Sequence, residues 1–184
     1  GIDVSRFSCH NKRRGKEIIS IGRFTEQKAI DKLIVAMDGL KDYNLSIIGL
    51  GPLEKDIRAL CKTRKNCKFL GYKTQEEIPK YLCNSRFTVM PSLFEGLPIS
   101  MLEAMSCGVI PITTAVGDIP SLIKEGINGF FLKNNSSDEI IKTVRNAEKS
   151  NIAKISINAE RVIREEYTWK NVCKKFLKTW KIEN

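Results

Sequence analysis

Short apolar segments alternate with longer amphipathic segments along most of this chain. Six runs have the length and composition of buried strands, and they cover residues 17–22, 45–49, 67–71, 87–90, 109–113 and 129–132. Helical patterns lie near residues 26–38, 52–64, 75–83, 98–106, 118–125 and 137–148. This alternation predicts an α/β fold, a Rossmann-like three-layer domain in which a mostly parallel sheet of about six strands has helices on both faces.

The length of 184 residues suits one domain or a large fragment of a longer protein. The chain opens on "GIDVSRF" without methionine, so we expect residues 1–184 to be a single domain cut from a longer protein. After "NNSSDE" the pattern is helical through Trp180, and residues 152–181 are expected to form appended helices. No apolar run reaches the roughly 18–20 residues of a membrane span, and no signal-peptide pattern occurs.

The formal net charge of +10 has several explanations. Basic residues cluster at 11–16, 62–68 and 170–181, but acidic residues are interspersed elsewhere and no aromatic stacking motif occurs. We therefore favour a solvated lysine-rich surface over nucleic-acid binding. Attraction to an anionic membrane surface or to a phosphorylated substrate is a third interpretation.

The six cysteines include no C-x-x-C pair, and several lie in apolar segments, where a thiol behaves as a small hydrophobe. We expect them to be reduced, as in a cytoplasmic protein with a good core. The single histidine, His10, is interpreted as a surface residue that builds no metal site. No Asp-x-Asp pair is present to hold a metal with a diphosphate, so no metal is expected.

Glycines follow the second predicted strand in "IIGLGPLE". Gly49 and Gly51 form half of a dinucleotide fingerprint, but Glu54 occupies the third position, where close helix–strand packing needs a small residue. A nicotinamide site is therefore less favoured than a tight strand-to-helix turn in which Pro52 opens the following helix. Backbone amides that line a nucleotide pocket remain compatible with this turn.

Two cations follow the first predicted strand in "ISIGRFTEQKAIDKLI". Arg23 comes directly after the strand, and Lys28 lies at the start of the next helical pattern. Ligands of parallel sheets bind at the carboxyl ends of the strands, and this pair of cations suits a diphosphate there. The alternative is that both are solvated surface charges.

The stretch "FEGLPISMLEAMSCG" places two glutamates in an otherwise apolar segment. Pro98 suits the start of a helix and Gly108 its end. Because this helix is apolar nearly all round, it should be buried, and Glu103 inside it is costly unless it accepts hydrogen bonds. Sugar hydroxyls would supply them; an internal arginine, backbone amides or water are the alternatives.

The start of the same helix predicts an anion site. Backbone amides around Gly96 and Leu97, together with the positive end of the helix dipole, would attract a phosphate. Glu95 would face whatever binds at this helix terminus. Its alternative role is that of an acid placed near an N-terminus because the dipole favours it.

These motifs together resemble the C-terminal half of retaining glycosyltransferases of family 4, the glycosyl transferases group 1 domain of GT-B architecture. The resemblance runs from "GIDVSRF" through "ISIGRFTEQKAIDKLIVAM" and "LSIIGLGPLEKDIRAL" to the stretch from "FLGY" to "GFFL". Its most specific part is a Glu-x7-Glu motif, here Glu95 and Glu103. The resemblance implies one half of a two-domain enzyme that transfers a hexose from a nucleoside diphosphate sugar (UDP or GDP) with retention, in polysaccharide, lipopolysaccharide or glycolipid synthesis.

The resemblance also implies a role for each matching residue. Glu103 would hold the ribose hydroxyls of the donor, and Glu95 would contact the transferred sugar. Arg23 and Lys28 would neutralise the diphosphate without a metal. The Gly96 and Leu97 amides would face the phosphates, Gly49 and Gly51 would lie in the same cleft, and the base would lie near Tyr72.

Two positions depart from the family pattern. Ala29 stands where a glycine often follows the lysine, and Leu97-Pro98 replaces the frequent Phe-Gly, so one amide donor is lost. The acceptor-binding N-terminal half is missing from this chain, so we expect it to bind a donor weakly and not to turn over. The alternative from another class is a non-catalytic nucleotide-binding or interaction module with the same fold.

Overall fold

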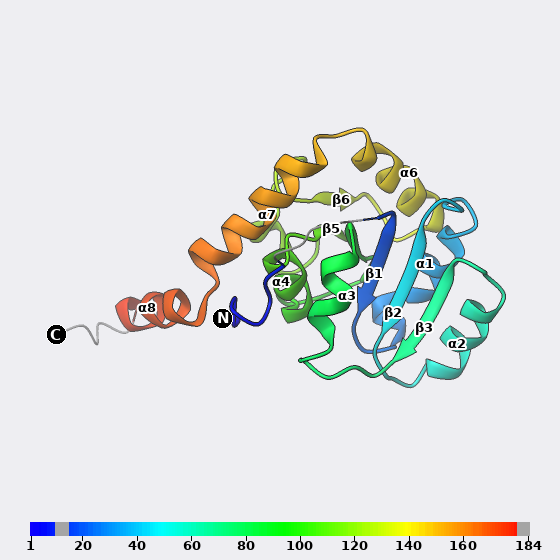
Figure 1. The fold of residues 1–184 in the computed structure, drawn as a ribbon, viewed down its shortest axis with the longest axis horizontal. Helices are drawn as coiled ribbons and strands as arrows, with labels where there is room; N and C mark the ends of the chain where they lie inside the picture. The colour runs from blue at the N-terminus through cyan, green and yellow to red at the C-terminus, as the bar shows by residue number, and fades with distance from the viewer. Residues whose placement is uncertain (10–14, 180–184) are drawn as a thin grey trace.

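The computed structural model describes residues 1–9 and 15–179. Six parallel strands form one sheet in the order β3-β2-β1-β4-β5-β6 (Figure 1). The strands are β1 (Glu17–Ile21), β2 (Asn44–Ile48), β3 (Cys67–Gly71), β4 (Phe87–Met90), β5 (Ile110–Thr114) and β6 (Phe130–Leu132). The predicted Rossmann-like sheet is therefore confirmed, and each strand lies within one residue of its expected bounds at either end.

The helices follow the prediction less closely. They are η1 (Glu26–Lys28), α1 (Ile30–Ala36), α2 (Glu54–Lys62), α3 (Ile78–Asn84), α4 (Ile99–Ser106), α5 (Ile119–Leu122), α6 (Ser137–Glu148), α7 (Ile152–Glu166) and α8 (Trp169–Thr179). The single helix expected over 26–38 was wrong, because Ala29 takes a left-handed conformation with φ +47° and separates η1 from α1. The predicted helix at 118–125 shortens to one turn, α5, followed by extended backbone at Ile123.

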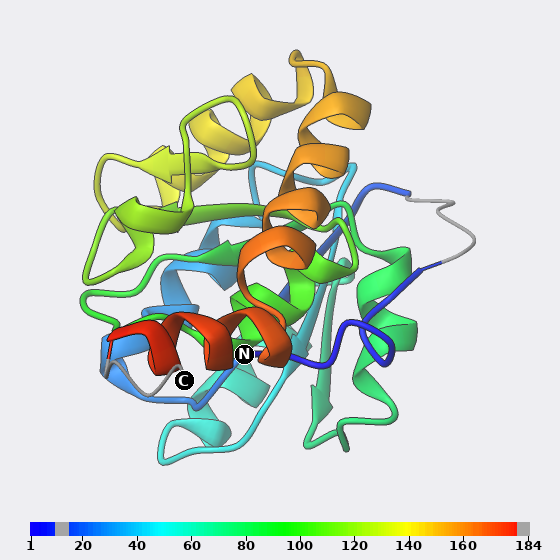
Figure 2. The same cartoon turned by 90° about the vertical axis from the view of Figure 1, so that its left-hand side faces the viewer.

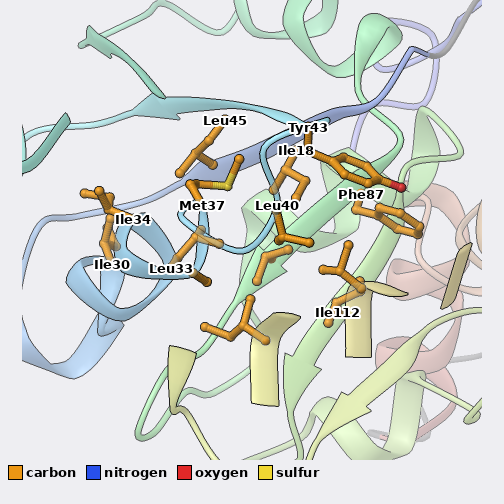
Figure 3. Packing of buried hydrophobic residues seen from close by; sticks show 14 of the residues in the cluster. Ile18, Ile30, Leu33, Ile34, Met37, Leu40, Tyr43, Leu45, Phe87 and Ile112 are labelled. Atoms are coloured by element: carbon orange, nitrogen blue, oxygen red, sulfur yellow. The ribbon is translucent and has the colours of Figure 1, made fainter. Parts of the chain in front are cut away.

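The apolar side chains of the strands alternate between two cores. On one face, Ile18, Leu45, Phe87 and Ile112 pack against α1, α2 and α6, as Figure 3 shows for the part beneath α1. This alternation follows from the period of two along each strand. The helices α1 and α6 thereby lie side by side on the same face.

The second face is covered by α3, α4 and α7. Ile19 and Ile48 point to this side and pack with α3 and the start of the chain, while Met90 packs with α4, α5 and α7. The helix α4 is buried almost all round, as predicted for its apolar sequence. It packs against α7, which crosses it in Figure 2.

The last helix has little contact with the rest of the fold. No side chain of α8 is buried, and Trp169 and Phe176 are 61% and 59% exposed. The helix extends from the end of α7 to one side of the domain (Figure 1). The prediction of helical structure through Trp180 extends past the described residues.

The amino ends of the strands carry a network of ion pairs. Lys16 precedes β1, and its Nζ lies 2.6 Å from Oδ2 of Asp42, which precedes β2. The same Nζ lies 2.7 Å from Oε1 of Glu148 at the end of α6. Arg145 donates to the same Asp42 at 2.9 Å. These partners hold the pKa of Asp42 well below its usual range, mainly through the Arg145 guanidinium.

The expectation that all cysteines are reduced was wrong for two of them. Cys9 and Cys83, in α3, form a disulfide, because the segment at the start of the chain runs along α3 and brings the two side chains together. His10 lies outside the described residues. Among the helices described, none is both long and apolar enough to cross a bilayer.

Candidate functional site

The strand order changes direction at β1, which lies between β2 and β4. The connections from β1 lead to β2 and β3 on one side, and the chain then returns to place β4 on the other side. In open parallel sheets, the carboxyl ends beside such a switch point form the ligand-binding crevice. The loops after β1, β2 and β4 carry most of the residues that the sequence singled out.

The two glycines after β2 allow two loops to approach closely. The Gly49 φ is +149°, and a Cβ there would clash with the Gly22 carbonyl oxygen; a Cβ on Gly51 would clash with Phe24. Phe24 N–H donates to Leu50 at 2.9 Å, which fixes the loop after β1 against the loop after β2. The predicted tight turn is confirmed, but Pro52 does not open the helix, because α2 begins at Glu54 with Leu53 as its N-cap.

Arg23 and Lys28 have different surroundings. Arg23 is exposed, and within the described chain its guanidinium makes no hydrogen bond or ion pair. Lys28 ends η1 and forms an ion pair with Glu95, whose side chain is only 7% exposed. The structure therefore brings together two of the predicted residues from separate loops and leaves Arg23 exposed at the surface.

The left-handed Ala29 sets the place of Lys28. Its φ of +47° ends η1, so the chain turns sharply between Lys28 and the start of α1. The Gln27 side chain donates to the Phe94 carbonyl at 2.7 Å, and Leu93 N–H donates to Gln27 at 2.8 Å. These bonds tie η1 to the loop that carries Glu95.

The start of α4 offers backbone donors. Pro98 is extended and precedes the helix, and the first amides of a helix have no partner within it. Gly96 is exposed with open space where a Cβ would lie, whereas Leu97 is partly buried in the core beside α4. Gly117, with φ +56°, packs closely against this turn, because a Cβ at this position would clash with the Glu95 carbonyl oxygen.

Glu103 lies one turn into α4 and faces a cavity of about 350 Å³. It is 6% exposed, and no side chain or amide of the described residues hydrogen-bonds its carboxylate. Burial therefore raises its pKa to about 7, while the nearby Arg6 acts in the opposite direction. A buried acceptor without a donor, at the wall of an open cavity, is suited to a ligand that brings hydroxyl or amide donors.

The two glutamates of the motif thus serve different places. Glu95 is paired with Lys28 at the loop after β4, whereas Glu103 lines the cavity together with Arg6, Gln75 and Ile99. The eight-residue spacing puts them on either side of the first turn of α4.

Sequence reasoning missed Arg6 and Gln75. Arg6 donates to Gln75 at 2.9 Å, and both line the cavity beside Glu103. Arg6 lies in residues 1–9, the opening segment, and Gln75 lies in the loop after β3, so no local sequence pattern connects them. Tyr72, predicted near the base, follows β3 and is 64% exposed, but it does not line this cavity.

Several large apolar side chains around these loops are exposed. They are Leu50, Tyr72, Leu93, Phe94 and Ile99, each between 50% and 64% exposed. All follow the carboxyl ends of strands or begin α4. Exposed apolar side chains gathered at one edge of a sheet are typical of a surface that another protein domain covers.

Comparison with known proteins finds a family model and several relatives that match most of this chain. The family model of glycosyl transferases group 1 matches residues 2–168. An uncharacterised glycosyltransferase of Methanocaldococcus jannaschii is 30% identical over 175 residues, which cover 91% of this chain and 45% of that protein. The putative colanic acid biosynthesis glycosyltransferase WcaL of Salmonella typhimurium is 29% identical, covering 83% and 41%.

A solved structure has the same fold. Anabaena HepE, crystallised in complex with UDP and glucose, superimposes with a TM-score of 0.85 at 17% identity, over 98% of this chain and 55% of that chain. At this identity the likeness concerns the fold alone. The chain spans less than half the length of the two curated relatives described above.

Proposed function

The chain belongs to the glycosyl transferases group 1 family, and we propose on that premise that it is the donor-binding half of a retaining hexosyltransferase that uses a nucleoside diphosphate sugar. The observation that carries the proposal is Glu103, which is buried, without a partner among the described residues, and open to a cavity of about 350 Å³. Such a cavity has the size of a small-ligand site.

The nucleoside occupies the cavity beside α4 in this proposal. The two ribose hydroxyls donate to the Glu103 carboxylate, which supplies the missing partners and favours its charged form. Gln75, held by Arg6 at 2.9 Å, stands at the same wall and is placed to contact the base. Tyr72 is kept as an outer contact only.

The diphosphate lies at the start of α4. Arg23, exposed after β1, approaches it together with the Gly96 and Leu97 amides and the positive end of the helix dipole. Lys28, paired with Glu95 in this structure, exchanges part of that pairing for the phosphate. The loop pair held by Gly49 and Gly51 fixes the approach of Arg23.

The chemistry places developing charge on the leaving diphosphate. Arg23, Lys28 and the helix terminus stabilise that charge in positions fixed before the reaction, so no metal is needed in this mechanism. Glu95 orients the transferred sugar by accepting from its hydroxyls, and its pairing with Lys28 couples the sugar to the phosphates. The hexose is transferred to an acceptor hydroxyl with retention at the anomeric carbon.

A second domain completes the enzyme. The exposed apolar side chains around the cleft, and those on α8, form the surface that the missing N-terminal half covers. The greater length of the relatives is consistent with this half. Without it the cleft stays open to water, so the isolated chain binds donor weakly and does not turn over.

The acceptor and the location follow by analogy. One relative is named for colanic acid biosynthesis, which suggests that this enzyme builds a polysaccharide or a lipid-linked glycan. We place it in the cytoplasm, at the inner face of the membrane, where the net charge of +10 favours an anionic surface.

Titration calorimetry with UDP and GDP tests the donor site. We expect one of them to bind, and Glu103→Gln to weaken that binding roughly 10- to 100-fold, since a charge-assisted hydrogen-bond pair is lost. Glu148→Gln, at the opposite end of the sheet, is the matched control and should leave the affinity unchanged. Binding unaffected by Glu103→Gln would refute the site.

A second measurement separates the enzyme from the non-catalytic alternative. The full-length parent should transfer sugar from a nucleotide donor to a glycan or lipid-linked acceptor, whereas the present chain should not. A parent that binds the nucleotide but transfers nothing would favour the non-catalytic module. Multiple turnovers by this chain alone would show that the proposed need for a second domain is wrong.

A further inference from the structure

Three cysteine sulfurs meet on the face of the domain that α3 and α4 cover. Cys9 ends the opening segment, Cys83 lies in α3, and Cys107 follows the last residue of α4. Their Sγ atoms all lie within 4.8 Å of one another, and Cys9 and Cys107 are buried. Three segments far apart in the sequence therefore converge on one cluster of sulfur atoms.

The surroundings of this cluster are apolar. It is packed with Phe7, Leu82, Ala104 and Val109, all buried. Among the described residues, no carboxylate joins the three sulfurs. An all-sulfur ligand set in such surroundings is suited to soft cations rather than to Mg²⁺ or Ca²⁺, which require oxygen ligands.

In this structure Cys9 and Cys83 are joined by a disulfide, so only the reduced chain offers three thiols. A dithiol reductant of the thioredoxin class supplies the two electrons and two protons that cleave the S–S bond and is itself oxidised to a disulfide. The products are the Cys9 and Cys83 thiols, beside that of Cys107. The cytoplasmic location proposed above would maintain this state.

We propose that the reduced chain binds one soft d¹⁰ cation, of the class of Zn²⁺, Cd²⁺ or Cu⁺, through Cys9, Cys83 and Cys107. Metal–sulfur bonds of about 2.3 Å place the sulfurs of a zinc thiolate site roughly 3.8 Å apart. After reduction the bonded sulfurs of Cys9 and Cys83 must move apart to reach that arrangement, whereas the Cys107 sulfur already lies within 4.8 Å of both. Binding releases the three thiol protons, because the thiolates are the ligands.

The site would tie together segments that serve the donor cavity. The opening segment carries Arg6, and α4 carries Glu103, which face the same cavity. The Ser106 hydroxyl donates to the Phe7 carbonyl at 2.7 Å, so these two segments already contact each other next to the cluster. Metal binding itself does not depend on the proposed glycosyltransferase activity.

Titration with Cd²⁺ tests the proposal, since thiolate-to-cadmium charge transfer absorbs in the ultraviolet. The chain reduced with a phosphine, which does not compete as a dithiol would, should take up one equivalent through these three sulfurs. The oxidised chain should show no such site. Equal uptake by the reduced and oxidised chains would overturn the proposal.

Variants assign the ligands. Cys107→Ala should lower the affinity for Cd²⁺ at least about 100-fold. Mutating a residue that only hydrogen-bonds a metal ligand already lowers metal affinity about 10- to 100-fold, and Cys107 would be a ligand itself. Because Cys107 is fully buried and its loss could unfold the chain, Cys9→Ala gives a second reading at the edge of the cluster. Cys67→Ala, in β3 next to Cys61, is the control and should retain binding. Tight binding that survives Cys9→Ala, or that is lost in a folded Cys67→Ala, would refute the assignment.

Discussion

The charged side chains at the two ends of the sheet differ in whether they have partners. At the amino ends of the strands, Lys16, Asp42, Arg145 and Glu148 satisfy one another within a single network. At the carboxyl ends, Lys28 and Glu95 form an ion pair, but Glu103 has no partner among the described residues. At the amino edge these four charged side chains are paired with one another, whereas the carboxyl edge keeps a buried carboxyl without a partner among the described residues.

This contrast separates charges that stabilise the fold from the buried carboxyl that we propose binds the donor. A partially exposed network contributes modestly to stability and needs nothing further. A buried carboxyl without donors lowers stability and persists only where another gain favours it. The carboxyl edge also holds the one described non-glycine residue with positive φ, Ala29, and the amino edge holds none.

The largest expected effect comes from removing one cation at each edge. Lys28→Met leaves Glu95, whose side chain is 7% exposed, as a buried charge without its partner and should lower the free energy of unfolding by about 3–5 kcal/mol. Arg145→Met should lower it by about 1 kcal/mol or less, because Asp42 is 40% exposed and keeps Lys16. Urea denaturation measures both values.

The double variant Lys28→Met/Glu95→Gln separates stability from binding. It should recover most of the lost stability. Nucleotide affinity should remain reduced roughly 10- to 100-fold, because the Lys28 ammonium that is proposed to bind the phosphates is absent. Arg145→Met should bind nucleotide normally. Equal losses of affinity in Lys28→Met and Arg145→Met would show that the two edges do not differ in function.

The pH dependence of stability should have opposite signs at the two edges. In the folded chain the Glu103 carboxyl keeps its proton up to the raised pKa of about 7, whereas the unfolded chain releases it near 4.5. Its stabilising contribution is therefore complete below pH 4.5 and is lost as the pH rises through 7. Glu103→Gln should abolish this decline, which we expect to be about 2 kcal/mol after allowance for solvent screening.

Glu148 provides the comparison. Lys16 lowers the pKa of its carboxyl below the ordinary 4.5, so its contribution is present above that pH and is lost as the pH falls. Glu148→Gln should therefore weaken the chain at neutral pH, where Glu103→Gln strengthens it. Unfolding curves recorded between pH 4 and pH 8 for both variants test the signs; parallel curves would contradict the comparison.

The smallest expected effect concerns backbone strain at the carboxyl edge. Ala29→Gly should raise the free energy of unfolding by about 0.5–1 kcal/mol, because its φ of +47° suits glycine. Ala36→Gly, in the right-handed α1, should lower it by about 1 kcal/mol. Denaturation midpoints compare the two variants, and a loss of stability in Ala29→Gly would mean that the left-handed turn carries no strain.

Much of the fold was predictable because its signals are local. Most strands are short apolar runs bounded by glycine or polar residues, so their alternation with helical patterns predicts the sheet. The apolar sequence of α4 predicts its burial. The break at Ala29 was missed because alanine favours right-handed helix, although a glycine often stands at this position in the family pattern.

The site was predictable in part for the same reason. Glu95 and Lys28 could be placed near each other because both follow strands that end at one edge of a parallel sheet. The pairing of Arg6 with Gln75, and that of Cys9 with Cys83, depend on how the opening segment lies over α3 and α4. No periodicity in the sequence encodes that path.

The Cys9–Cys83 bond also makes a covalent ring of the first half of the fold. With a separation of 74 residues, the ring encloses β1 to β3 with α1 and α2, while α4 lies outside it. Closing a ring of this size restricts the unfolded chain and is worth about 4 kcal/mol in the chain-entropy model. Lys28 lies within the covalent ring and Glu95 in the linear chain that follows it. Their ion pair is therefore one of the non-covalent contacts that hold the linear part of the chain to the ring.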